Sequence, residues 1–448
     1  MMTRNETGNR PEQGRLFNPF LKDMIDRNHP MVRLADSIDW KNFEDALAPS
    51  FCDGNGRPSI PVRMMVGMHY LKHMADVSDG DVLAGWLENP YWQYFTGGVH
   101  FEHEIPFDSS SMTRWRRRIR QEGAEEMLAE SIRTGLKTKL IRRSDLDRVN
   151  VDTTVQEKKV RHPTDARLYH RSIETLARVA GDAGVELRQT YRRVAKRSML
   201  KIGGYSKARQ MKRLKRETRH LRTLAGRVLR DFVRKASEGV RSRNEALLAR
   251  ISKILSQQRH DKNKAYSVHA PEVECIAKGK VHKRYEFGVK AGLVTTSRGN
   301  WIVGAKTYPG NPYDGHTLGD ALSQVSAITG TDPKMACCDL GYRGHGYEGP
   351  CDVQVVNRYR RQTDAALRRH WKRRSAIEPV IGHVKTDCGG NRNQLKGSEG
   401  DMLNILFAAA AFNMRKLMRG LALFLRELFI APFCFSPETK GSAICRVA

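Results

Sequence analysis

The sequence lacks the features that mark several classes of protein. None of its eight cysteines lies in a C-x2-C pair, so a zinc ribbon or zinc knuckle is not expected. The N-terminus has no apolar segment typical of a secretory signal, which favours reduced thiols in a cytoplasm. The most apolar stretch, residues 402–433, is interrupted by charged side chains such as Arg415, Lys416 and Arg419. We therefore expect no membrane span.

Acidic residues are also scarce. The 448 residues include 78 Lys and Arg against 49 Asp and Glu, which gives a formal net charge of +29. Such a charge predicts a polyanionic partner, either nucleic acid or an anionic membrane surface. Hydrophobic residues make up 40% of the chain, enough to build a core and to exclude general disorder. The length fits two to three domains at about 150 residues each.

Residues 1–145 have a helical pattern. Met65, Met68, Leu71 and Met74 recur every three residues, and core packing is the simplest reason for this stripe. Residues 108–111 resemble a helix N-cap, and the helix that would follow carries several arginines. Arg114 and Arg117 on this helix are candidates for contact with a DNA groove. The alternative is a solvated basic helix face without a partner.

Residues 170–265 form a second helical and very basic segment. Between Arg171 and Lys264 there are 27 Lys and Arg against 8 Asp and Glu. An apolar stripe that includes Leu221, Leu224, Val228 and Phe232 predicts a helical hairpin or bundle, with Gly203-Gly204 and Gly239 as candidate breaks. The basic face is a candidate for contact with the DNA backbone. Self-association of the segment is the alternative, and both can hold.

Short β-type runs flank this segment and predict an α/β protein. One run, residues 148–154, is expected to end near Asp152, and another, residues 334–339, ends at Asp339. Further strands are expected within residues 285–305 and 352–356, and Glu378 lies in a basic helical segment. Carboxylates that converge at strand ends suit Mg²⁺, with Mn²⁺ as a substitute. For any one acid alone, a surface or salt-bridged role is the more common case.

The spacing around Glu378 adds to this prediction. Arg374 and Lys385 lie four residues before it and seven after it. This places the three side chains on roughly one helix face, unless Pro379 kinks the helix or splits it in two. Such a face would suit an active site, because the carboxylate of Glu378 could bind a metal and the two flanking cations could bind phosphate. A simple ion pair between Arg374 and Glu378 is the alternative. His316, in a turn-rich stretch, is a weaker candidate for a general base, against local capping or packing.

The segment WKRRSAIEPVIGHVK, residues 371–385, resembles the Y-x2-R-x3-E-x6-K signature of DDE insertion-sequence transposases. It departs at the first position, where Trp371 replaces the usual Tyr. VNVDTTVQEKKVRHPTDARLYHR and CCDLGYRGH resemble the family's first-Asp and second-Asp segments. HPMVRLADSIDWKNFE and IPFDSSSMTRWRRRI resemble the helical domain of the insertion sequence 5 family.

The resemblance implies a ribonuclease-H-like mixed sheet with flanking helices in residues 146–430, interrupted by the basic helical insertion at 170–265. A helical DNA-binding domain (1–145) would precede it, and a tail (431–448) would follow. Asp152, Asp339 and Glu378 would form the catalytic, metal-binding triad. Arg374 and Lys385 would contact DNA, and Trp371 would either stack on a base or pack in the core.

The implied activity is metal-dependent cleavage at the ends of an insertion sequence, followed by transfer of the freed 3′-hydroxyl to target DNA. A homodimer or larger assembly would hold two ends together, and the helical domain would recognise the terminal inverted repeats. The expected location is the nucleoid of a prokaryotic cytoplasm. Two alternatives remain open: a DDE-type nuclease that cuts without joining, and a non-catalytic DNA-binding relic of a transposase.

Overall fold

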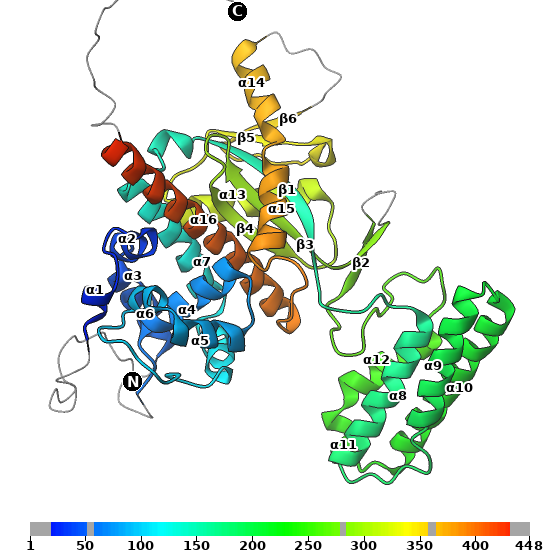
Figure 1. Cartoon of the computed structure of the whole chain (residues 1–448). Coiled ribbons are helices and arrows are strands. Elements are labelled where there is room, and N and C mark those ends of the chain that lie inside the picture. Colours follow the sequence, from blue (N-terminus) through cyan, green and yellow to red (C-terminus); the bar gives the residue numbers. More distant parts are fainter. Residues whose placement is uncertain (1–18, 52–57, 278–283, 357–363, 431–448) are drawn as a thin grey trace, which may run out of the picture.

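A computed structural model describes residues 19–51, 58–277, 284–356 and 364–430. Figure 1 shows three parts: a group of helices from the N-terminal segment, a sheet beside them, and a helical insertion that stands apart from both. The predicted tail at 431–448 lies outside the described residues.

The N-terminal part is helical, as its apolar spacing predicts. Its helices are α1 (Leu21–Met24), α2 (Pro30–Ser37), α3 (Trp40–Leu47), α4 (Val62–Ala75), α5 (Asp79–Glu88), α6 (Pro90–Phe95) and α7 (Ser110–Lys137). The methionine stripe of α4 is buried and belongs to the main hydrophobic core, so the packing interpretation is confirmed. The helix α7 has a kink at Arg120, whose φ of 53° and ψ of −155° are not helical.

The sheet is mixed and contains β1 (Arg148–Glu157), β2 (Glu274–Ala277), β3 (Tyr285–Thr296), β4 (Ile302–Tyr308), β5 (Met335–Cys338) and β6 (Asp352–Val355). Its order is β2-β3-β1-β5-β6, and β4 also pairs with β3. The pairs β1–β3, β2–β3 and β3–β4 are antiparallel, whereas β1–β5 and β5–β6 are parallel. Residues 285–296, where strand structure was predicted, form one long strand.

The first strand is longer than the sequence predicted. Asp152 was expected near its end, but β1 continues to Glu157 because it stays paired with β3 as far as Gly288. Asp152 therefore lies in mid-strand, opposite Leu293. Asp339 does follow directly on its strand, β5. The two acids are therefore held by neighbouring parallel strands, since β1 and β5 pair at Asn150 and Cys337.

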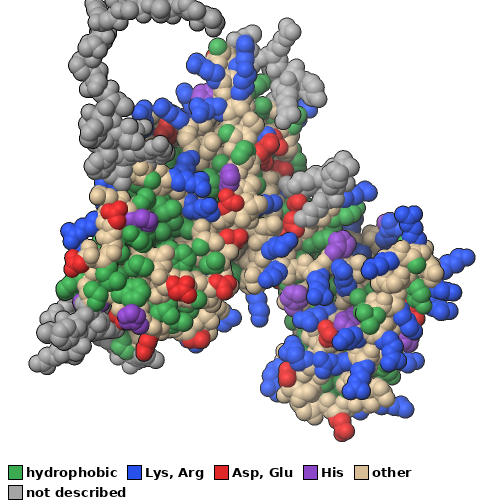
Figure 2. Space-filling view, viewed as in Figure 1, with side chains coloured by type: hydrophobic (Ala, Val, Ile, Leu, Met, Phe, Trp, Pro, Cys, Tyr) green, Lys and Arg blue, Asp and Glu red, His purple; other side chains and the backbone are tan. Residues whose placement is uncertain are grey.

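The basic insertion is a helical unit between β1 and β2. It contains α8 (Asp165–Asp182), α9 (Arg192–Lys207), α10 (Met211–Lys235), α11 (Glu238–Arg243) and α12 (Glu245–Ser256). Leu221, Leu224, Val228 and Phe232 are buried in a hydrophobic core of its own, separate from the main core. This confirms the predicted apolar stripe. Figure 2 shows Lys and Arg side chains over much of the insertion's visible surface.

The glycines predicted as helix breaks do not break these helices. Gly203 and Gly204 lie inside α9, which continues to Lys207, and Gly239 lies inside α11. Ala195 and Ile202 of α9 are buried in the insertion's core, and this packing outweighs the weak helix propensity of the two glycines. The break follows instead near Arg209, which has a φ of 51°.

The remaining helices pack around the sheet. They are α13 (Leu318–Thr329), α14 (Ala365–Arg374), α15 (Ile377–Asp387) and α16 (Gly397–Ile430). Of these, α13, α15 and α16 also contact helices of the N-terminal part. The long helix α16 packs against α2, α4, α7 and β4. Asn413 on α16 shows the connection, since its Nδ2 atom donates to Ser131 Oγ of α7 at 2.9 Å and to the Ile302 carbonyl of β4 at 2.8 Å. One hydrophobic core therefore runs through the N-terminal helices and the sheet.

Candidate functional site: three carboxylates around one arginine

The three predicted acids come from three separate elements. Asp152 lies in the middle of β1, Asp339 follows β5, and Glu378 is the second residue of α15. The Asp152 side chain is 14% exposed, Asp339 40% and Glu378 59%. The site therefore runs from a nearly buried carboxylate to one that is open to solvent.

Arg374 contacts all three carboxylates. Its Nη2 atom lies 2.7 Å from Asp152 Oδ2 and 3.5 Å from Asp339 Oδ2, and its Nη1 atom lies 3.6 Å from Glu378 Oε1. The guanidinium is 11% exposed. The structure thus brings together four residues that the sequence singled out, although Arg374 takes a position among the acids rather than one facing outward.

Arg374 and Glu378 were predicted on one helix, and the structure corrects this. α14 ends at Arg374 and α15 begins at Ile377, with a tighter turn between them in which Ala376 N–H donates to Arg373 O and Glu378 N–H to Ser375 O. Pro379 has no N–H to continue the α-helical pattern, so it is accommodated in the first turn of α15, where none is needed. Lys385 is on α15 with Glu378, as predicted.

Backbone groups fix the two aspartates. Asp152 Oδ1 accepts a hydrogen bond from the Thr153 N–H at 2.8 Å. Asp339 Oδ1 accepts one from the Gly341 N–H at 2.9 Å, as the N-cap of a short 3-10 helix, η5 (Leu340–Tyr342). These bonds hold each carboxylate in place independently of Arg374.

A further acid, Asp314, lies beside the site, and sequence reasoning missed it. Its Oδ1 atom accepts from Thr153 Oγ1 at 3.0 Å and from Lys290 Nζ at 2.8 Å. A Cβ atom on Gly341 would lie 2.9 Å from Asp339 Oδ1 and 3.1 Å from Asp314 Oδ2, so the two acids flank this glycine. The turn-rich stretch around Asp314 was the available signal, but His316 was the candidate chosen there. That histidine is exposed and meets the ring of Tyr313 edge-on.

The carboxylates do not form a ready metal cage. Within the described residues, no three or more His, Cys, Asp or Glu side chains are grouped so that they could hold a metal ion together. The Nη2 atom of Arg374 takes the place that a cation shared by Asp152 and Asp339 would need. Three carboxylates are nevertheless the donors that a hard cation such as Mg²⁺ prefers. The donor set fits Mg²⁺ by its chemistry, once Arg374 has moved.

The predicted DNA-binding residues near the site differ in exposure. Trp371 on α14 is half-buried, α14 has no fully buried residue, and Trp371 belongs to neither hydrophobic core. Packing as a core residue is therefore wrong for Trp371. Its Nε1 atom is buried and has no hydrogen-bond partner among the described residues. Lys385 is half-buried on α15.

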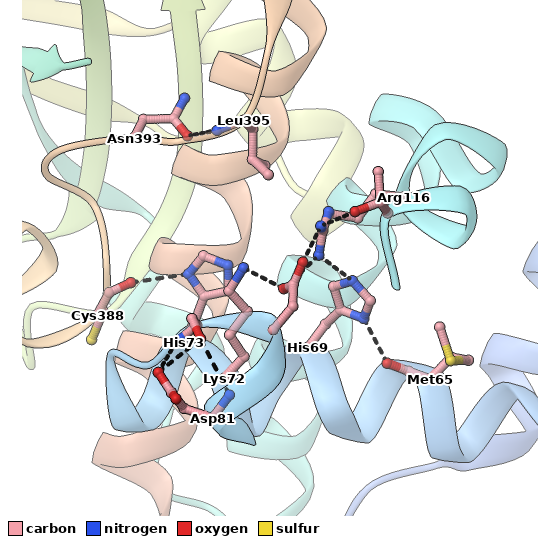
Figure 3. A network of polar contacts seen from close by, with 12 residues as sticks. Met65, His69, Lys72, His73, Asp81, Arg116, Cys388, Asn393 and Leu395 are labelled. Atoms are coloured by element: carbon pink, nitrogen blue, oxygen red, sulfur yellow. Dashed lines mark hydrogen bonds and ion pairs between the residues drawn. The ribbon is translucent and has the colours of Figure 1, made fainter. Parts of the chain in front are cut away.

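The arginine-rich start of α7 has two kinds of arginine. Arg114 and Arg117 are exposed, as a role in DNA contact requires. Arg116 is 4% exposed, and its guanidinium makes two hydrogen bonds to Asp79, at 3.0 and 2.5 Å. Figure 3 shows Arg116 grouped with His69, Lys72 and His73 of α4. This part of the helix is thus anchored by a buried ion pair.

Charges in this buried group shift several pKa values. Burial, with Lys72 and Arg116 nearby, lowers the pKa of His73 to about 3, although the Cys388 carbonyl that its Nδ1 contacts at 3.1 Å opposes this. Burial and Arg116 also lower the pKa of His69 well below its usual range. Burial alone would raise the pKa of Asp79, but its bonds to Arg116 and Lys72 outweigh burial and hold that pKa well below its usual value. Both histidines are therefore neutral near pH 7.

The cysteines next to Asp339 are small core residues. Cys337 and Cys338 are buried, and burial raises the pKa of the Cys337 thiol to about 11 and that of Cys338 well above its usual value. Both are therefore protonated and unreactive near neutral pH. Across the described part of the chain, no helix combines the length and apolar character that crossing a bilayer requires.

The fold and site define an α/β protein with an acidic site in a basic chain, and comparisons with known proteins give its family. Residues 19–118 match a transposase domain (DUF772), and residues 252–414 match a transposase DDE domain. The second match includes Asp314, Asp339 and Glu378, whereas Asp152 lies before it. The chain therefore belongs to the DDE transposases.

One relative, "Uncharacterized protein ORF8 in nfe locus" of Rhizobium meliloti, is 47% identical over 203 residues. This alignment covers 45% of the present chain and 98% of the relative. No solved structure matches the chain.

Proposed function

We propose that this transposase cuts DNA at the ends of an insertion sequence and joins the freed ends to target DNA, with Asp152, Asp339 and Glu378 as its catalytic acids. The observation that carries the proposal is the meeting of these three carboxylates, from β1, β5 and α15, at one guanidinium. Asp152 and Arg374 lie 222 positions apart in the sequence and still converge on this point, which a chance surface ion pair would not require.

The strand order supports a ribonuclease-H-like catalytic core. Apart from the short strand β2, which pairs with β3, the strands β1, β3 and β4 form an antiparallel set. They are followed in the chain by β5 and β6, which add in parallel on the other side of β1. Asp152 in the central strand and Asp339 after its parallel neighbour then lie next to each other. Helix α15, which carries Glu378, packs against β1. This geometry gives the acids fixed supports on the sheet.

Asp152, Asp339 and Glu378 would hold Mg²⁺, with Mn²⁺ as a substitute. The ion would supply charge neutralisation at the phosphoryl group and activation of the attacking oxygen. The chain's own cations, Arg374 and Lys385, would bind the non-bridging phosphate oxygens and keep the scissile phosphate against the acids.

The reaction consists of two displacements at phosphorus. In the first, a water oxygen forms a P–O bond and the 3′-oxygen of the element's end leaves as a hydroxyl. In the second, this 3′-hydroxyl attacks a phosphate of target DNA, and the target's own 3′-oxygen leaves. Each step forms one P–O bond and breaks one, so joining needs no external energy source.

The DNA would be held by several basic surfaces. Arg114 and Arg117 of the helical part would contact the terminal inverted repeats, and the insertion would contact the backbone of neighbouring DNA. Because joining requires both ends in one complex, we expect a homodimer or larger assembly. The site of action would be the nucleoid of a prokaryotic cytoplasm.

The test is a Mg²⁺-dependent assay on a supercoiled plasmid that carries the DNA flanking this coding sequence. Wild-type protein should cut at the flanks and give joined products, whereas Glu378→Gln should do neither while still binding the DNA. Arg373→Gln, which alters an exposed neighbour, is the matched control. Cleavage without joining would show a nuclease, and binding without cleavage by the wild type would show a DNA-binding relic; either result would overturn the proposal.

A further inference from the structure

A cleft of about 470 Å³ lies between the helical part and the DDE part, away from the three carboxylates. One wall comes from α4, the turn after it and the start of α7, with Lys72, His73 and Arg117 among its residues. The other comes from the segment between α15 and α16, residues 389–396, and the start of α16. Both transposase domains therefore contribute to one hollow.

The cations of the cleft fall into two groups. Lys72 and Arg116 are already bound to Asp79, with Lys72 Nζ 2.6 Å from Asp79 Oδ1. Arg117, Arg392 and Lys396 are exposed, and none of them has an ion-pair partner among the described residues. Two transposase domains thus contribute three lining cations that are not bound to a carboxylate of the described residues.

The acidic residues of the cleft do not cancel this charge. Asp79 is engaged by Lys72 and Arg116, which leaves Asp76 and Glu399 as the other carboxylates of the lining. Burial, together with nearby Asp387, raises the pKa of Asp76. The lining therefore keeps an excess of positive charge and attracts an anion.

Asn391, a residue of the cleft's lining, has a side-chain acceptor without a partner among the described residues. The side-chain Oδ1 of Asn391 is buried and accepts no hydrogen bond among the described residues. A buried acceptor without a donor costs free energy, unless a bound molecule supplies an N–H or O–H. The phosphodiester group of a DNA backbone has no such donor at neutral pH, whereas the amino group of a base does. A nucleotide carries both groups, and a hollow of this volume is in the size range of small-molecule sites.

The backbone of the cleft is held in an unusual form. Arg392 has a φ of 52° and Asp76 one of 53°, in the left-handed region that favours glycine. Gly389, with a φ of 70°, passes so close to α4 that a Cβ atom there would lie 3.3 Å from His73 Nδ1. Such conformations persist where the surroundings enforce them, and they occur preferentially at binding sites. An arginine stands at a position where glycine would be less strained.

We propose that this cleft binds one strand of DNA, with its phosphates at Arg117, Arg392 and Lys396 and a base edge at Asn391. The identity of the ligand rests on the proposed function, because it is the DNA on which the transposase acts. The cleft would fix the DNA relative to both domains at once. The N-terminal domain would then do more than recognise an end, since it would complete a binding site with the DDE part.

The test measures fluorescence anisotropy of the full-length protein with a labelled 20-nucleotide single strand over a range of salt concentrations. Arg392→Ala/Lys396→Ala should weaken binding at least tenfold and make the slope of log K against log salt less negative by about 0.7 for each phosphate that is no longer neutralised. Lys22→Ala/Lys41→Ala, which removes two exposed cations outside the cleft, should leave the slope unchanged. Circular dichroism checks the fold of each variant.

Asn391→Ala is a second variant that removes no charge. It should weaken binding of the oligonucleotide while leaving weak competition by inorganic phosphate unchanged. Equal slopes for wild type and Arg392→Ala/Lys396→Ala would overturn the cleft proposal. The proposed function would still stand in that case if Glu378→Gln alone abolished cleavage. Conversely, normal cleavage by Glu378→Gln would overturn the proposed function without touching the single-strand binding data.

Discussion

The Nη2 atom of Arg374 lies 2.7 Å from Oδ2 of Asp152, and these residues are the most deeply buried pair at the acidic site. The same nitrogen lies 3.5 Å from Asp339, so the guanidinium serves as the countercation of the carboxylates. A metal ion bound by these carboxylates would therefore compete with Arg374 for the same oxygens. Arg374 would be released toward phosphate when a metal binds.

Replacing Arg374 by Gln should consequently tighten Mg²⁺ binding, by up to about tenfold, because the competing charge-assisted hydrogen bonds are gone. Calorimetric titration of the protein without DNA measures this effect. Arg373→Gln removes an equal charge at an exposed neighbouring position and should leave Mg²⁺ affinity near that of wild type. Weaker Mg²⁺ binding by Arg374→Gln would mean that the arginine organises the acids instead of competing for them.

Asp314→Asn should destabilise the protein by about 1–3 kcal/mol, because it leaves Lys290, whose side chain is 9% exposed, without its carboxylate. Urea unfolding measures the loss. The double variant Asp314→Asn/Lys290→Met should recover much of the stability, because it no longer contains the unpaired buried ammonium of Lys290. No recovery in the double variant would show that Asp314 acts through other contacts.

Trp371→Ala should weaken binding of DNA ends by about tenfold or more, since stacking on a base contributes about 1–3 kcal/mol. Mg²⁺ affinity should stay unchanged, because Trp371 is not one of the acids. Trp371→Phe keeps a ring for stacking and should retain most of the DNA affinity. An equal loss of Mg²⁺ affinity in Trp371→Ala and Glu378→Ala would contradict this assignment.

The basic insertion should contribute to the salt dependence of duplex binding. Changing four exposed cations of α9 and α10 to Gln (Lys196, Arg197, Lys215 and Arg219) should make the slope less negative, by up to about 0.9 for each phosphate that these side chains neutralise in the wild type. The comparison protein is Lys22→Gln/Lys41→Gln. An unchanged slope together with an altered sedimentation coefficient would identify the insertion as an assembly surface instead.

Stability should fall as the pH drops below about 6.5, in part because His73 is buried as a neutral side chain. Its pKa is about 3 in the folded protein and near 6.5 in the unfolded chain, so between these values the unfolded state binds the extra proton. Folding then loses about 1.4 kcal/mol per pH unit for this group. Urea unfolding at pH 7, 6 and 5 gives the free energy of unfolding at each pH. This free energy should fall less steeply with decreasing pH for His73→Asn than for wild type.

The sequence pointed to the three acidic residues, but it did not predict the strand and helix boundaries around them. Asp152 and Asp339 are recognisable because β-branched and apolar runs surround them. The end of β1 was wrong because it depends on pairing with β3, more than a hundred residues later. The helix break before Glu378 was only one of the possibilities, since Pro379 fits equally into a kinked helix or a first turn. Asp314 was missed because its relation to Thr153 is purely tertiary.

The insertion's own hydrophobic core has a consequence for how such proteins diversify. The chain leaves the sheet after β1, forms the insertion and returns to the sheet at β2. The strands β1 and β3 pair directly, without contribution from the insertion. Its helices can therefore be lengthened, exchanged or lost with little effect on the packing of the sheet. Under the proposed function, natural variation in the insertion would change DNA binding and leave the proposed catalytic acids on the sheet in place.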